Sequence, residues 1–116
     1  MILNDVQGAL DAIDEHTYYG TAAPHPKDKP WDYIVFLRDV LKRNANKSGY
    51  TDEIIVEIVR EEFIPDGLPE KVIGALEALA GVRLIEGRNE YWYAVKPSTQ
   101  LTVEKLTLHF SHSRKS

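Results

Sequence analysis

The segment from Ile54 to Val59 constrains the fold more than any other part of the chain. Five of its six residues are β-branched. Such residues each cost a helix a few tenths of a kcal/mol relative to alanine, roughly 2 kcal/mol for the group. Ile54, Val56 and Ile58 also alternate with their neighbours, as residues on the buried face of a strand do. We therefore predict a strand over residues 53–63.

A second apolar run, residues 31–38, is rich in aromatic and β-branched residues, which favours a strand. Residues 44–49 have turn composition, so the two runs are predicted to pair as an antiparallel hairpin. The strand would be covered on both sides, because apolar residues occupy both of its faces: Trp31, Tyr33, Val35 and Leu37 on one, Ile34 and Phe36 on the other. A helix remains an alternative, because five residues share a helical face: Trp31, Ile34, Val35, Arg38 and Leu41.

Two segments have helical periodicity. Residues 2–13 place Leu3, Val6, Leu10 and Ile13 on one face. Residues 69–80 begin with a proline, which suits the first turn of a helix, and are followed by Gly81, which suits a left-handed cap. The buried stripe expected for this second helix consists of Val72, Ile73, Leu76, Leu79 and Ala80.

The remaining segments complete an α+β domain. We predict an edge strand at 17–21, a proline-bearing loop at 22–30, a hairpin joining 82–85 to 90–95, and a strand at 104–111 with one solvated face. Residues 112–116 are expected to form a mobile tail. The prediction is thus a single domain, residues 1–116, with a mainly antiparallel sheet of four to six strands. The N-terminal helix and one central helix pack on one face of that sheet.

Composition and motifs give no indication of an enzyme or a cofactor. The chain has no cysteine and a net charge of −4, which argues against thiolate chemistry and, weakly, against nucleic-acid binding. We find no apolar run of about 20 residues, no secretory signal, and no phosphate-loop, nucleophile-elbow or zinc-protease motif. The histidines do not have metal-ligand spacing, since His109 and His112 would point to opposite faces of a strand.

Charge is unevenly distributed along the chain. The segment from Asp52 to Glu70 holds seven carboxylates and one cation, Arg60, while a basic cluster lies at the predicted hairpin tip. The acidic segment is expected to form a solvated face of the domain. Opposite patches on one domain can also meet head-to-tail between copies. The candidate subunit-interface residues are therefore Arg38, Lys42, Arg43, Lys47, Glu57, Glu61 and Glu62.

Several phrases of the sequence resemble one family. Residues 17–20 (Thr-Tyr-Tyr-Gly), a proline-bearing loop and residues 29–36 (Lys-Pro-Trp-Asp-Tyr-Ile-Val-Phe) look like the opening of phage tail-terminator and head–tail joining (neck) proteins of long-tailed phages. Residues 64–72 (Ile-Pro-Asp-Gly-Leu-Pro-Glu-Lys-Val) and 106–110 (Leu-Thr-Leu-His-Phe) look like prophage structural proteins of Gram-positive bacteria. The resemblance covers nearly the whole chain. It consists of the order of the helices and strands and of these few short sequence segments.

The resemblance implies a virion structural protein of the tail or neck, made in the cytoplasm of the host bacterium. Such proteins form a ring, usually a hexamer, at the end of the tail tube, and their partners are the tail-tube protein and a head-completion protein. No membrane and no specific nucleic acid is expected as a partner. The family offers no invariant functional residue to carry over.

A winged-helix DNA-binding regulator is the alternative. It requires helices at 31–44, 51–62 and 69–80, with 82–95 as the wing. Its charge is unfavourable, because the recognition helix would carry Lys71 against Glu70 and Glu77.

Overall fold

The computed structural model describes residues 1–20, 31–45, 49–96 and 99–115. Its central strand is β3 (Gly49–Glu61), and β2 (Tyr33–Arg43) pairs with it antiparallel, from Tyr33↔Val59 to Arg43↔Tyr50. The predicted hairpin of two strands is therefore confirmed, with both strands longer toward the turn. The helices that a winged-helix fold needs at 31–44 and 51–62 are absent, so that alternative is wrong.

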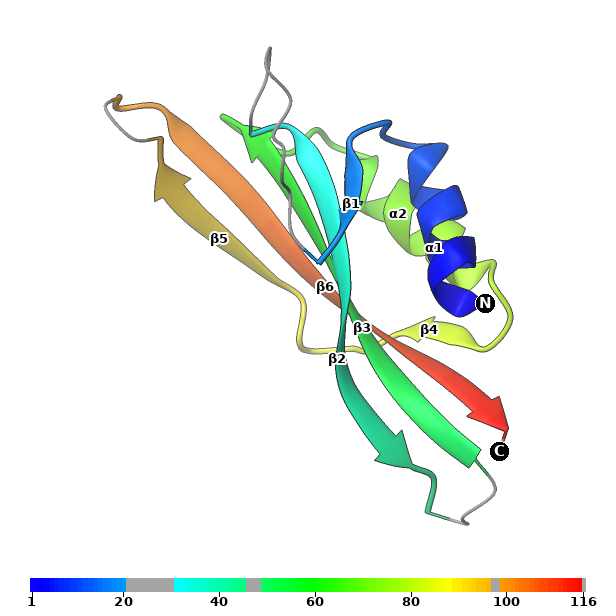
Figure 1. Cartoon of the computed structure of the whole chain (residues 1–116). Coiled ribbons are helices and arrows are strands. Elements are labelled where there is room, and N and C mark those ends of the chain that lie inside the picture. The colour runs from blue at the N-terminus through cyan, green and yellow to red at the C-terminus, as the bar shows by residue number, and fades with distance from the viewer. Residues whose placement is uncertain (21–30, 46–48, 97–98, 116) are drawn as a thin grey trace.

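The sheet is mixed and continues on both sides of this hairpin (Figure 1). On one side β1 (Thr17–Tyr19) pairs parallel with β2 and forms the expected edge strand. On the other side β6 (Thr102–Lys115) pairs antiparallel with β3 along its whole length. Residues 112–115, predicted to be a mobile tail, are instead the last residues of β6, because β3 extends to Gly49 and offers them ladder partners.

The predicted hairpin between residues 82–85 and 90–95 is wrong. Both β4 (Val82–Leu84) and β5 (Glu90–Val95) pair with β6, against residues 110–112 and 102–107 respectively. They lie end to end along one edge of β6. The Asn89 side chain bridges the junction between these two strands. Its Oδ1 accepts from the His109 N–H at 2.9 Å, and its Nδ2 donates to the Ile85 carbonyl at 2.9 Å. Two short apolar runs around a turn thus predict two strands without determining their partners.

Both helices, α1 (Ile2–Asp11) and α2 (Leu68–Glu77), lie over the same face of the sheet (Figure 1). Val6 and Leu10 of α1, and Val72 and Leu76 of α2, are fully buried. They pack on the predicted core-facing residues Ile54, Val56 and Ile58, together with Ile34, Phe36, Leu106, Leu108 and Phe110 of the neighbouring strands. The helical stripe differs from the prediction at one position: Ala80 is exposed and Ala75 packs against the core, because α2 ends at Glu77.

The opposite face of the sheet carries no helix among the described residues, yet the residues of β2 that face it, Tyr33, Val35 and Leu37, are buried or half-buried, as predicted. Val59 on this face is buried as well. We call it the open face. The far ends of β2, β3 and β6 extend beyond the helices as a twisted three-stranded projection (Figure 1). We call residues 40–43, 49–53 and 111–115 the distal arm.

The observed fold is α+β, with an N-terminal helix, a central helix and a six-stranded, mostly antiparallel mixed sheet. None of the helices that the structure describes is long and apolar enough to cross a membrane.

Candidate assembly surface

The predicted basic interface residue Lys42 lies beside a carboxylate of the acidic segment within the same chain. β2 carries Lys42 and β3 carries Glu53, and the ammonium Nζ lies 2.7 Å from the carboxylate Oε2. Arg88 reaches the other oxygen of the same carboxylate at 2.8 Å. Glu53 is only 4% exposed. The hydrogen bond from Lys42, followed by that from Arg88, holds the pKa of Glu53 below its usual value.

The rest of the basic tip also makes intrachain contacts. The Arg43 guanidinium lies 5.6 Å from the centroid of the Tyr50 ring and donates to its hydroxyl at 3.3 Å. Arg114 lies over the same ring and contacts Asp52, with 3.3 Å between Nε and Oδ2. Arg38 is exposed on β2. Lys47, also predicted for this cluster, lies outside the described residues.

The acidic interface residues of β3 are partly neutralised as well. Glu57 lies 3.4 Å from the Lys105 ammonium, and Glu61 lies 2.9 Å from that of Lys96. Glu62 is exposed and has a positive φ of 68°. The expected solvated acidic face is therefore wrong at Asp52 and Glu53, which are buried. Hairpin register thus pairs part of each patch inside one chain, while Arg38, Arg43 and Glu62 remain exposed and available to another copy.

The edges of the sheet differ in how their backbone groups are satisfied. At β1, the Ile34 N–H donates to the His16 carbonyl and the Gly20 N–H to the Phe36 carbonyl. The carbonyl of Thr17 therefore faces away from β2, and the side-chain Nε2 of Gln7 on α1 donates to it at 3.2 Å. Helix α1 thus caps this short edge.

The β4 edge is capped too. The Val82 N–H donates to the Leu79 carbonyl at 3.2 Å, and the Leu84 N–H donates to the Glu77 carboxylate at 3.0 Å. Both acceptors belong to α2 or the turn that follows it. Side chains and turns thus satisfy the donors that would otherwise bond another strand.

The β5 edge is different. The Lys96 N–H donates to the Leu101 carbonyl at 2.9 Å, one position beyond the last β5–β6 pair. Since antiparallel pairs alternate between bonded and non-bonded, the backbone groups that face β6 belong to Glu90, Trp92 and Ala94. Those that face outward belong to Tyr91, Tyr93 and Val95. No strand in the described part of the chain pairs with this outer side.

The side chains of β5 are also unusually exposed for their size. Tyr91, Trp92, Tyr93 and Val95 are 51%, 54%, 66% and 62% exposed. The strand contains no proline, no glycine and one charge, Glu90. A long apolar edge of this kind promotes pairing with another strand. The sequence did not predict this exposed edge, because an aromatic, apolar strand is equally typical of a buried position in a sheet.

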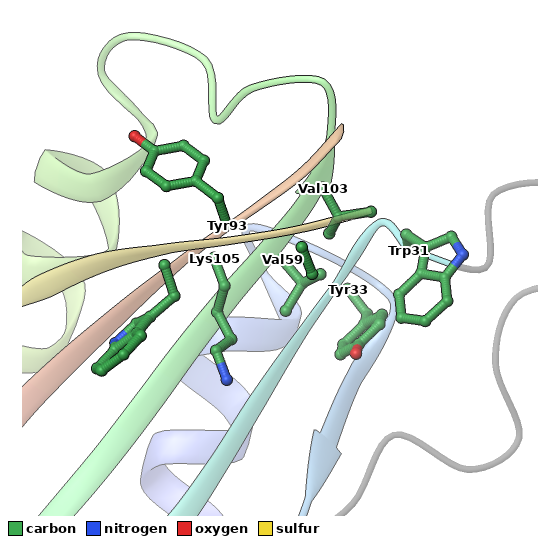
Figure 2. Close-up of a pocket in the computed structure, with 8 residues that line it drawn as sticks. Trp31, Tyr33, Val59, Tyr93, Val103 and Lys105 are labelled. Carbon is green, nitrogen blue, oxygen red and sulfur yellow. The ribbon is translucent and has the colours of Figure 1, made fainter. Parts of the chain in front are cut away.

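A shallow hollow of about 350 Å³ lies on the open face beside β5. Its floor follows one cross-strand row, Tyr33↔Val59↔Lys105↔Trp92, through β2, β3, β6 and β5. Figure 2 shows Trp31, Tyr33 and Lys105 on this side of the sheet, whereas Tyr93 projects to the opposite side of β5. The Tyr93 phenol donates to Glu104, and this hydrogen bond raises the pKa of Tyr93. Apolar and aromatic walls with one ion-paired lysine suit packing against another apolar surface.

Three of the four histidines, His16, His109 and His112, lie in the part of the chain that the structure describes. In the described ranges no group of three histidine, cysteine, aspartate or glutamate side chains could hold an ion. His109 lies on the open face opposite Ile55, and His112 is paired with Asp52 at 3.9 Å on the other face, as the strand alternation predicts. His25 lies outside the described residues.

The sequence matches no protein-family model and no curated protein.

Proposed function

We propose that the chain is a structural subunit of a phage virion. It assembles into a ring at the head-proximal end of the tail, ends growth of the tail tube and joins the tail to the head. Its partners are further copies of itself, in a hexamer, together with the tail-tube protein and a head-completion protein. It acts in the virion after synthesis in the host cytoplasm, and it has no catalytic role.

The apolar β5 edge, which no described strand pairs on its outer side, carries the inference that the chain is a subunit of an assembly. A protein that acts alone gains nothing from four large apolar side chains along an open strand, whereas a subunit of an assembly buries them. The element order implied by the family resemblance, a helix, a short strand, a long hairpin, a helix and closing strands, agrees with the observed order.

Deletion of the gene from a phage or prophage that carries it tests the role. We expect filled heads without tails, and tubes of uncontrolled length, because nothing ends their growth. A copy supplied on a plasmid should restore joined particles of normal tail length. Particles with normal, attached tails in the absence of the gene would refute the proposal.

Charge at the ring contact can be tested separately. Exposed ion pairs contribute about 0–1 kcal/mol each, so charge sets register more than affinity. We expect Arg43→Glu to weaken ring formation at high protein concentration, as raised salt does. Arg83→Glu, on the capped β4 edge, is the matched control and should leave the rings intact. Light scattering and electron microscopy provide the readout, and rings unaffected by Arg43→Glu would exclude the basic tip from the contact.

A further inference from the structure

We propose that β5 pairs antiparallel with β5 of a second copy, around a two-fold axis at Tyr93, so that one sheet continues through two chains. The starting observation is the outer side of β5, which presents the backbone groups of Tyr91, Tyr93 and Val95 while the β1 and β4 edges are capped. Figure 1 shows β5 at the outer margin of the sheet.

The register follows from which backbone groups point outward. A two-fold antiparallel pairing must join outward-facing residues to outward-facing residues. A two-fold axis at Trp92 or at Ala94 gives only two of the three outward-facing residues of β5 a hydrogen-bonding partner among those same three residues. An axis at Tyr93 satisfies all three: Tyr93 pairs with its own copy and Tyr91 with Val95 of the second copy. Each of these pairs exchanges two hydrogen bonds.

The side chains are complementary in this same register. Trp92 lies opposite Ala94 of the second copy on the open face, which sets the largest side chain of the strand against the smallest. Tyr91 lies opposite Val95, and the two Tyr93 rings are cross-strand neighbours on the helix-bearing face. Aromatic and aromatic–β-branched pairs of this kind stabilise sheets. At the two ends, Glu90 lies opposite Lys96, whose ammonium also pairs with Glu61 of its own chain, so no like charges oppose each other.

The other free edge of the sheet is a weaker partner for β5. Beyond the three residues paired with β1, the outer side of β2 carries Arg38, Asp39, Lys42 and Arg43, and its register shifts between Arg38 and Val40. Charges and bulges are features that keep edge strands from pairing. The β5 edge of a second copy has no register shift and only one charge, Glu90, which favours the symmetric pair over a head-to-tail pair of β5 with β2.

The two-fold pair does not rest on the proposed ring. It uses backbone groups of β5, whereas the candidate ring residues that the structure describes lie on β2, on β3 and directly after β3. A two-fold contact combined with a closed head-to-tail contact would give two rings related by two-fold axes. Failure of either contact would leave the other in place, so each can be tested alone.

The absence of cysteine from the chain permits a direct test of register. With Tyr93→Cys, the two cysteines lie directly opposite, with Cα atoms about 5.5 Å apart, inside the range for a disulfide. We expect a covalent dimer when oxidised glutathione is added to the full chain. Tyr91→Cys is the matched control: its two copies lie four positions apart along the strands, roughly 13 Å, too far to be bridged. Equal or faster cross-linking of Tyr91→Cys would overturn the register.

Two further variants test the pairing without cross-links. Tyr93→Lys places two like charges opposite each other, and Val95→Pro removes an outward N–H without breaking a bond to β6. Sedimentation equilibrium should show a monomer–dimer equilibrium for the unaltered chain, and a dissociation constant raised at least tenfold in both variants. Tyr19→Lys, an exposed tyrosine on the capped β1 edge, should leave it unchanged. Circular dichroism confirms that each variant is folded. An unaltered chain that stays monomeric at millimolar concentration, or folded variants that dimerise normally, would overturn the proposal.

Discussion

At the scale of single residues, Glu53 shows most clearly where the structure departs from the charge pattern of the sequence. As one of seven carboxylates in an acidic segment it suggests a solvated face, but it is buried between two cations from different strands and turns. Lys42 could be inferred as a partner from hairpin register, since it lies near Glu53 across the predicted turn. Arg88 could not be inferred. It lies in the loop between β4 and β5, and the position of that loop depends on both strands pairing with β6 and not with each other.

Glu53→Gln should destabilise the protein at neutral pH and reduce its sensitivity to acid. The pKa of Glu53 is lowered in the folded state, so its contribution is present above the ordinary value of 4.5 and is lost as the pH falls through the folded pKa. We expect a loss of about 1–3 kcal/mol at pH 7, as for hydrogen bonds to charged groups. Below pH 4 the difference between the variant and the parent should shrink.

Urea unfolding at a series of pH values measures this effect. The control is Glu86→Gln, which removes an exposed carboxylate at a turn and should change stability little at any pH. A difference between Glu53→Gln and the parent that persists undiminished in acid would mean that packing, and not charge, is what Glu53 contributes.

Gly81 is the second residue with a specific requirement. Its φ is +78°, and an added Cβ would lie 3.0 Å from the carbonyl oxygen of Ser113. Gly87 has the same φ but open space around the position of a Cβ. We therefore expect Gly81→Ala to cost more than Gly87→Ala, about 2–3 against about 1 kcal/mol. Equal shifts of the denaturation midpoint would show that β6 moves away from the added methyl group at no cost.

At the scale of elements, periodicity predicted every helix and strand but not every neighbour. Alternation and β-branching identified β2, β3 and β6, and the turn at 44–49 correctly paired the first two. For β4 and β5 the same signals predicted a hairpin. At the junction of these two strands one amide, Asn89, hydrogen-bonds to the Ile85 carbonyl and the His109 N–H, and periodicity carries no information about such a group.

Asn89→Ala should therefore loosen the junction of β4 and β5 more than Asn89→Asp does. Alanine removes both hydrogen bonds, whereas aspartate still accepts from the His109 N–H and loses only the bond to the Ile85 carbonyl. We expect a loss of about 1–3 kcal/mol for alanine and a smaller loss for aspartate, measured by thermal unfolding. Asn4→Ala, at an exposed position of α1, is the control. An equal loss for the two variants would show that the donor, and not the acceptor, holds the junction.

At the scale of the whole molecule, the two helices cover one face of the sheet and leave the other open. The candidate assembly surface follows from that asymmetry, because the aromatic hollow and the β5 edge both lie where no helix covers the sheet. Sequence could predict the core-facing residues, which are apolar in any such fold. It could not distinguish an apolar strand with a neighbour on each side from one with a neighbour on one side only, since that depends on the order of strands across the sheet.

The distal arm also has consequences for motion. Residues 40–43, 49–53 and 111–115 extend past the helices, and none of them belongs to the hydrophobic core. Elements with few buried apolar contacts open locally, at a fraction of the free energy of global unfolding. The amide hydrogens of Lys42 and Thr51 should therefore exchange with deuterium through frequent local openings. Those of Val56 and Ile58 should exchange only when the whole domain unfolds. Hydrogen exchange followed by NMR should give two distinct opening energies along a single strand, β3, and one uniform value would mean that the arm and the core open as one unit.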